Sequence, residues 1–152
     1  MADGKSTNPS LRPPLHGHGD GDGSSSCSWV LLDMYPYIAD RNSSTSAEAE
    51  TVRVTLCAAP PPLVSYVCVW CPGLAASEIY KTTLEAAESD LLVLRVTLRS
   101  RGPHGEFFVY KASASNGPLL RPLQVPLECL CRRCHIGVLA FTMTMRSSLM
   151  TS

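Results

Sequence analysis

Residues 91–111 read as two strands joined by a turn-rich loop, and this hairpin constrains the fold more than any other stretch of the chain. Apolar side chains recur at alternate positions of the first strand, at Leu92, Leu94, Val96 and Leu98. Alternate residues of a strand point to the same face, so the pattern predicts one buried face. Gly102 and Gly105 mark the turn, and residues 106–111 form the second strand. We expect the rest of the folded chain to pack around this hairpin.

Other strands are predicted on both sides of the hairpin. Residues 63–70 are apolar on both faces apart from Ser65, which is typical of a central strand covered on both sides. Residues 51–58 alternate well, and residues 29–34 are a plausible first strand. A further strand at 119–125 is expected at a sheet edge, because prolines flank it and interrupt it.

Two stretches are less regular. Residues 41–50 are rich in Ser, Thr, Ala and Glu and are predicted to form a loop. Residues 75–89 allow a short helix, but Thr82 and Thr83 favour a loop with a short strand at about 79–84. The whole pattern predicts an all-β fold with mainly antiparallel strands.

Composition divides the chain into three parts. Residues 1–26 are rich in Gly, Ser, Pro, Asp and His and contain little that could be buried, so we expect a disordered arm. Residues 27–125 form the predicted β-rich domain. Residues 126–152 form an irregular tail rich in Cys, Met and Ser.

Charge and cysteine content narrow the class of protein. A formal net charge of zero gives no basic field for a nucleic acid, so none is expected as a partner. The first residues form no apolar signal segment, and the longest apolar run near the end is too short to span a membrane. We therefore expect a cytoplasmic or nuclear protein without a membrane anchor, whose seven cysteines are thiols.

Four of these segments, in this order, resemble a large plant family that is expanded in grasses and known as domain of unknown function 1618. The matching stretches are residues 29–33, 62–69, 90–96 and 107–112. The resemblance covers roughly 29–122 and implies an all-β protein of repeated antiparallel strands, similar to propeller-type domains. It implies no catalytic residue and no cofactor.

The resemblance ends at about Pro122, where relatives continue into further strands. We therefore expect a truncated member of the family, folded as a partial sandwich or propeller-like sheet. Residues 63–70 and 91–98 would then lack cover, and an open sheet edge templates pairing with another chain. This predicts self-association through an exposed sheet edge.

The cysteines suggest one metal site. Cys68 and Cys71 form one pair and Cys131 and Cys134 another, and two such pairs are the ligand set of structural zinc. Residues three apart in a strand point to opposite faces, which argues against the first pair. Cys131, Cys134 and His135 also match a haem-attachment pattern, which requires export machinery and a haem pocket. The alternative is that Cys57 and Cys68 are small buried apolar residues.

No arrangement of nucleophile, base and orienting group is apparent in the sequence. We expect a non-enzymatic protein-interaction module with an unidentified protein partner. The alternatives are a structural zinc or thiol module that uses the four cysteines, and a fragment of a larger protein without independent function.

Overall fold

The computed structural model describes residues 12–16, 29–112 and 115–124. Short 3₁₀ turns occur at Ala76–Glu78 and Arg99–Arg101, and within the described ranges no helix has the length and apolarity to cross a membrane. The strands are β1 (Leu31–Leu32), β2 (Tyr37–Ile38), β3 (Ser46–Ala49), β4 (Val52–Cys57), β5 (Val64–Trp70), β6 (Ile79–Glu88), β7 (Leu91–Leu98), β8 (Glu106–Lys111) and β9 (Leu119–Leu123).

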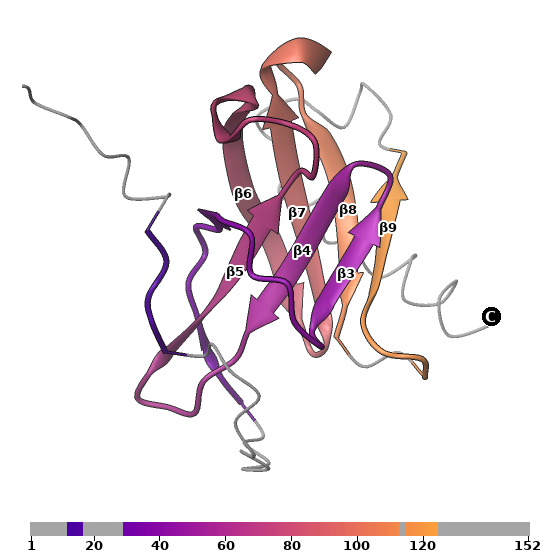
Figure 1. Cartoon of the computed structure of the whole chain (residues 1–152). Helices are drawn as coiled ribbons and strands as arrows, with labels where there is room; N and C mark the ends of the chain where they lie inside the picture. The colour runs from indigo at the N-terminus through magenta and orange to yellow at the C-terminus, as the bar shows by residue number, and fades with distance from the viewer. Residues whose placement is uncertain (1–11, 17–28, 113–114, 125–152) are drawn as a thin grey trace, which may run out of the picture.

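These strands form two sheets (Figure 1). The first sheet has the order β1-β5-β4-β3, and β2 pairs with β5 further along that strand. The second sheet has the order β6-β7-β8-β9, which is also the order of the strands in the sequence. β1 and β2 run parallel to β5, whereas the remaining pairs are antiparallel. The predicted all-β, mainly antiparallel fold is confirmed.

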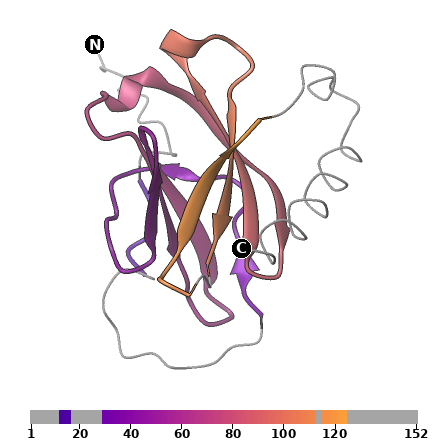
Figure 2. The same ribbon diagram turned by 90° about the vertical axis from the view of Figure 1, so that its right-hand side faces the viewer.

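An apolar core lies between the two sheets, which form the two layers seen in Figure 2. Val54 and Val67 of the first sheet and Leu94 and Phe108 of the second are fully buried there. The Tyr110 hydroxyl of β8 also donates a hydrogen bond of 2.6 Å to a carbonyl oxygen just before β3. The architecture is therefore a two-layer sandwich.

The predicted hairpin is present as β7 and β8. Gly105 precedes β8 with a φ of 72°, a conformation that side-chain-bearing residues rarely adopt. A Cβ atom at this position would lie 2.6 Å from the Thr97 hydroxyl oxygen, so glycine is also required by space. The turn therefore fixes how closely the loop approaches β7.

Three predicted segments differ from the structure. β3 lies within the predicted loop 41–50, where a tight turn at Glu50 (φ 53°) sets it against β4. β6 has ten residues and extends beyond the expected 79–84, so the helical alternative for this stretch is wrong. β1 has two residues, fewer than the expected 29–34.

β5 and β7, the two strands expected to lie uncovered, are in fact covered by neighbouring strands. β5 lies between β1 and β4, and its residues from Ser65 to Val69 are buried. β7 lies between β6 and β8, and all of its residues except Arg95 are buried. The uncovered strands that led us to predict self-association are therefore not present, and self-association stays a prediction.

Part of the predicted disordered arm is placed against the first sheet. Residues 12–16 accept hydrogen bonds there from Tyr66, at the carbonyl oxygens of Pro14 and His16. The prediction for residues 1–26 therefore has to be amended at these five residues. They cover the side of the first sheet that faces away from the core, which we call the outer face.

Candidate functional site

The structure separates two of the four predicted zinc ligands. Cys68 lies on the outer face of β5 together with Cys57, whereas Cys71 lies in the core between the sheets. Cys131 and Cys134 fall outside the described residues. Within the described ranges no group of three or more His, Cys, Asp or Glu side chains could hold a metal ion. The four-cysteine zinc site stays a prediction, without support from the placement of its first pair.

A different pair of thiols does come together, and we call it the thiol pair: Cys57 of β4 and Cys68 of β5. Cys57 lies opposite Tyr66, and Thr55 lies opposite Cys68, so the two cysteines are diagonal neighbours on one face. The two side chains pack against each other and against Tyr66 in one buried cluster. The exposed fractions of the two residues are 3% and 1%. The pair therefore forms a buried contact between neighbouring strands.

The arm segment 12–16 covers this pair through Tyr66. The Tyr66 hydroxyl lies 2.7 Å from the His16 carbonyl oxygen and 2.9 Å from that of Pro14. The His16 ring packs edge-on against the Tyr66 ring, and its Nε2 lies 2.8 Å from the Val64 carbonyl oxygen. Arg41 donates a further hydrogen bond of 3.1 Å to the Pro14 carbonyl oxygen. One tyrosine thus connects the arm to the thiol pair.

The thiols of the described residues differ in acidity. The hydrogen bond from Cys68 outweighs burial and lowers the pKa of Cys57 from 9.0 to about 7, and the Arg41 charge acts in the same direction. The same hydrogen bond, together with burial, raises the pKa of Cys68. Tyr66, which also donates to the arm, lowers the pKa of Cys57 in the same direction. Burial raises the pKa of Cys71. Cys57 is therefore the first of these three thiols to ionise.

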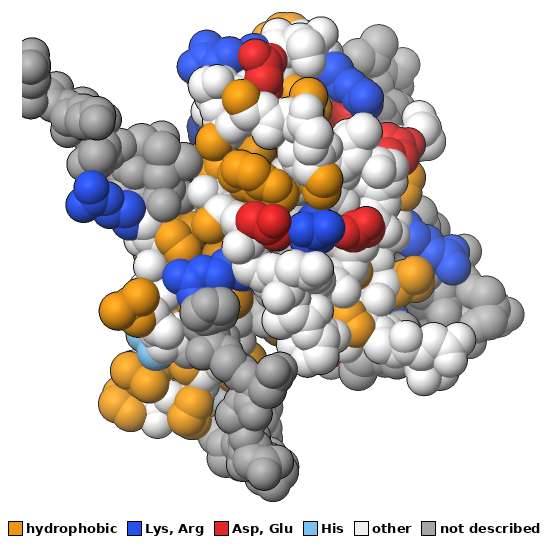
Figure 3. All heavy atoms as spheres, viewed as in Figure 1, with side chains coloured by type: hydrophobic (Ala, Val, Ile, Leu, Met, Phe, Trp, Pro, Cys, Tyr) orange, Lys and Arg blue, Asp and Glu red, His pale blue; other side chains and the backbone are white. Residues whose placement is uncertain are grey.

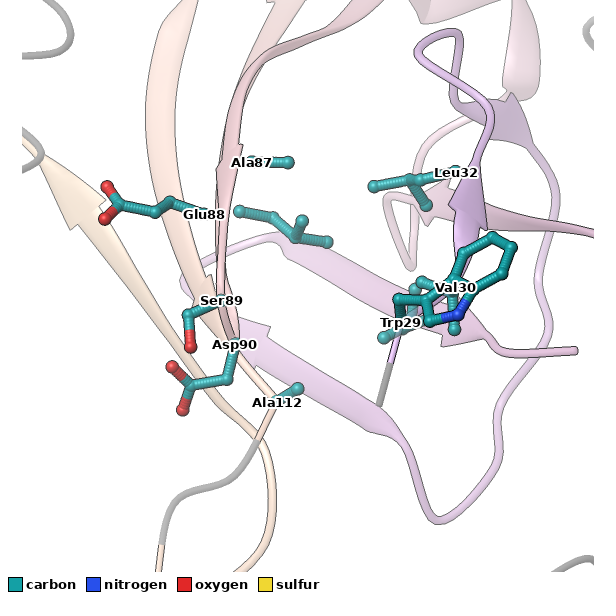
Figure 4. Close-up of a pocket in the computed structure, with 10 residues that line it drawn as sticks. Trp29, Val30, Leu32, Ala87, Glu88, Ser89, Asp90 and Ala112 are labelled. Carbon is teal, nitrogen blue, oxygen red and sulfur yellow. The ribbon is translucent and has the colours of Figure 1, made fainter. Parts of the chain in front are cut away.

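A second candidate site is a cavity of about 440 Å³ between the two sheets (Figure 4). Residues 29–32, just before and within β1, form one wall, and the turn between β6 and β7 forms the opposite wall. Its volume lies within the range of roughly 300–1,000 Å³ that is usual for ligand pockets. The lining residues are Trp29, Val30, Leu32, Leu56, Ala87, Glu88, Ser89, Asp90, Leu92 and Ala112.

Backbone pairing and hydrogen bonds fix the position of the polar wall, which is formed by residues 88–90 of the β6–β7 turn. Glu88 pairs with Leu91 across the turn, and Ser89 between them has a φ of 55°. The Ala112 amide donates a hydrogen bond of 2.9 Å to the Asp90 carbonyl oxygen, which ties the turn to the end of β8. In Figure 4 the carboxylates of Glu88 and Asp90 point away from Trp29. They add negative charge near the cavity and leave its interior apolar.

The mouth of the cavity continues into an exposed apolar surface, which we call the edge patch. Figure 3 shows hydrophobic side chains gathered at the lower left of one face of the molecule. Leu31 of β1 pairs with Val64 of β5, whose carbonyl oxygen lies against the arm at His16. The residues of the edge patch are Leu15, Trp29, Val30, Leu31, Leu63 and Val64, each more than two-fifths exposed. Contiguous exposed apolar surface of this kind is typical of interaction sites.

Neither of these sites was found from the sequence. The contact between Cys57 and Cys68 depends on the register of β4 against β5, which alternation within each strand does not specify. A signal was present, because Cys57 follows Leu56 and Cys68 lies between Val67 and Val69, whose side chains pack against the core. The cavity depends on how β1 meets the β6–β7 turn, and no local pattern predicts that distance.

Comparison of the chain with protein-family models, with curated proteins and with solved structures finds no match. The resemblance to the plant family therefore stays a prediction.

Proposed function

We propose that this chain is a non-enzymatic protein-interaction module, which binds an extended apolar segment of a partner protein at the cavity and the edge patch. The observation that carries the proposal is the position of Trp29 at the mouth of the cavity, where 61% of its surface is exposed. Large aromatic side chains beside apolar pockets are the residues that most often dominate binding energy at interfaces.

The shape of the site favours a polypeptide over a small molecule. The cavity opens onto the edge patch, so a ligand that filled only the cavity would leave most of the exposed apolar surface in water. β1 is also an outer strand of the first sheet, and an edge strand can pair with an added strand. An extended chain can use both features, with one bulky side chain in the cavity.

Charge restricts the sequence of the bound segment. Glu88 and Asp90 lie in the cavity wall, and like charge close to them opposes an acidic ligand. The segment should therefore place an aromatic or branched aliphatic side chain in the cavity and carry a basic or neutral residue next to it.

The test is binding of fluorescently labelled extended peptides, followed by anisotropy. The library pairs one anchoring aromatic residue with either lysine or glutamate beside it. We expect the lysine series to bind, and Trp29→Ala to weaken its binding by roughly tenfold or more. Tyr80→Ala is the matched control, because Tyr80 has a similar exposed fraction of 62% and does not line the cavity.

Equal affinity of Trp29→Ala and the unchanged protein would remove the cavity from the proposal. Failure of every apolar peptide to bind would reject the function as a whole. A preference for glutamate beside the anchor would contradict the part that rests on charge.

A further inference from the structure

We propose that Cys57 and Cys68 are an oxidation site, at which a peroxide converts the thiol pair into a disulfide between β4 and β5. The site is on the outer face of the first sheet, apart from the cavity, and it does not rest on the proposed binding function. Its ligand class is a small peroxide, and its product is reversed by a thiol reductant.

The placement of the two sulfurs is the first support. Both cysteines point to the outer face and pack together in one buried cluster with Tyr66. Diagonal neighbours on one face of adjacent antiparallel strands lie about 7–8 Å apart, so a small movement of the strands would bring the two sulfurs together. The third described cysteine, Cys71, lies on the other side of the sheet and has no such neighbour in its core cluster. The fold therefore selects one pair from these three thiols.

The second support is the positive charge of the half-buried Arg41, which acts on the pair. Arg41 uses one guanidinium nitrogen to hold the Pro14 carbonyl oxygen, whereas its Nη1 is buried without a hydrogen-bond partner. A buried polar nitrogen without a partner is unfavourable, and such groups in folded proteins call for an explanation. The Arg41 charge stabilises the thiolate of Cys57. The same nitrogen could donate to an oxygen placed on that sulfur.

The chemistry needs two steps. The Cys57 thiolate attacks one oxygen of hydrogen peroxide, the O–O bond breaks, and a sulfenic acid forms while hydroxide leaves and takes up a proton as water. The Cys68 sulfur then attacks the Cys57 sulfur, and the S–O bond breaks as a second water leaves with the Cys68 proton. Two thiols lose two electrons in total, and the peroxide is reduced to two waters.

The product should be easy to reduce. A disulfide requires a sulfur–sulfur distance of about 2.05 Å and a restricted dihedral angle. Diagonal neighbours reach it only if the two strands shift from their present register contacts, so the bond would form under strain. Strained disulfides are the more readily reduced and regulatory kind.

The arm controls access. Peroxide must reach the sulfur of Cys57, a residue that is only 3% exposed, and the described residues over that face include the arm held by Tyr66. Removing the Tyr66 hydroxyl should release the arm more often while leaving both sulfurs in place. The rate of oxidation should therefore rise in Tyr66→Phe.

The experiment treats the full chain with hydrogen peroxide, blocks the remaining thiols by alkylation and maps the chymotryptic peptides by mass spectrometry. Chymotrypsin cleaves after Tyr66 and Trp70, so it puts Cys57, Cys68 and Cys71 in three different peptides. We expect a linked Cys57–Cys68 peptide that dithiothreitol separates, with Cys71 alkylated. In Cys68→Ser, a sulfenic-acid reagent should label Cys57.

Tyr66→Phe should form the link about fivefold to tenfold faster, as expected for the loss of a hydroxyl hydrogen bond. Free Cys57 and Cys68 after prolonged treatment with excess hydrogen peroxide would overturn the proposal. A link between Cys68 and Cys71 would overturn it as well. Because the unchanged protein already gives the decisive peptide, failure of a variant to fold leaves the result valid.

Discussion

The two faces of the first sheet differ in what they bury. Its inner face, with Val54 and Val67, contributes mainly apolar side chains to a core shared with the second sheet. Its outer face, with Cys57, Tyr66 and Cys68, buries groups that donate, accept or ionise. Both faces belong to the same two strands, β4 and β5. Burial alone therefore does not separate structural residues from chemically active ones; the difference is the presence of polar partners.

The largest expected effect comes from adding one hydroxyl to each face. Val67→Thr places a hydroxyl in the apolar core, where the unpaired group should lower the free energy of unfolding by about 1–3 kcal/mol. Cys68→Ser keeps a donor beside the Cys57 sulfur and should cost less than about 1 kcal/mol. Urea unfolding of the two variants measures the difference. Equal costs would show that the outer face is an ordinary core.

A smaller effect is expected from pH, and only on the outer face. The pKa of Cys57 is lower in the folded protein, about 7, than its ordinary 9.0, so its ionisation stabilises the fold. The free energy of unfolding should rise from pH 7 toward 9, and this gain is lost as the pH falls through 7. Cys68, with its raised pKa, opposes the gain only above pH 9.

Chemical unfolding at several pH values, compared with Cys57→Ser, isolates this contribution from Tyr66, Arg41, His16 and the other groups around the pair. The ultraviolet absorbance of the thiolate gives an independent reading, with a midpoint near pH 7 that the variant should lack. A thiolate that appears only near pH 9 would contradict the acidity of Cys57.

The smallest effect should come from the exposed rim of the outer face. Arg53 of β4 lies 2.8 Å from Asp40 and 2.6 Å from Glu48, and about half of each acidic side chain is exposed. Exposed ion pairs contribute about 0–1 kcal/mol and weaken with salt. Arg53→Met should therefore change thermal stability slightly, with a difference that shrinks at high salt. A loss as large as that of Val67→Thr would mean that the pair is structurally central.

The strands with strong local patterns were predictable, whereas their partners were not. Alternation in β4 and β7 and the continuous apolar run in β5 depend on side chains within each strand. β3 has the sequence Ser-Ala-Glu-Ala, which has weak strand propensity, and it forms because the turn at Glu50 sets it against β4. The thiol pair and the cavity were not predictable from local sequence patterns, because each depends on how two separate elements are positioned relative to each other.

The parallel pairing of β1 and β2 with β5 has a consequence for the order in which the molecule assembles. Every pair in the second sheet joins strands that are consecutive in the chain, and such local contacts form quickly. β1 can pair only after β5 has formed, and its two paired residues close a long loop of intervening chain. We expect this edge to form last and to open first, as a separate unit of local unfolding. Trp29 precedes β1, and the arm rests on the neighbouring β5 at Val64. A single local opening at this edge would therefore disrupt the edge patch and, by displacing the arm, expose the thiol pair.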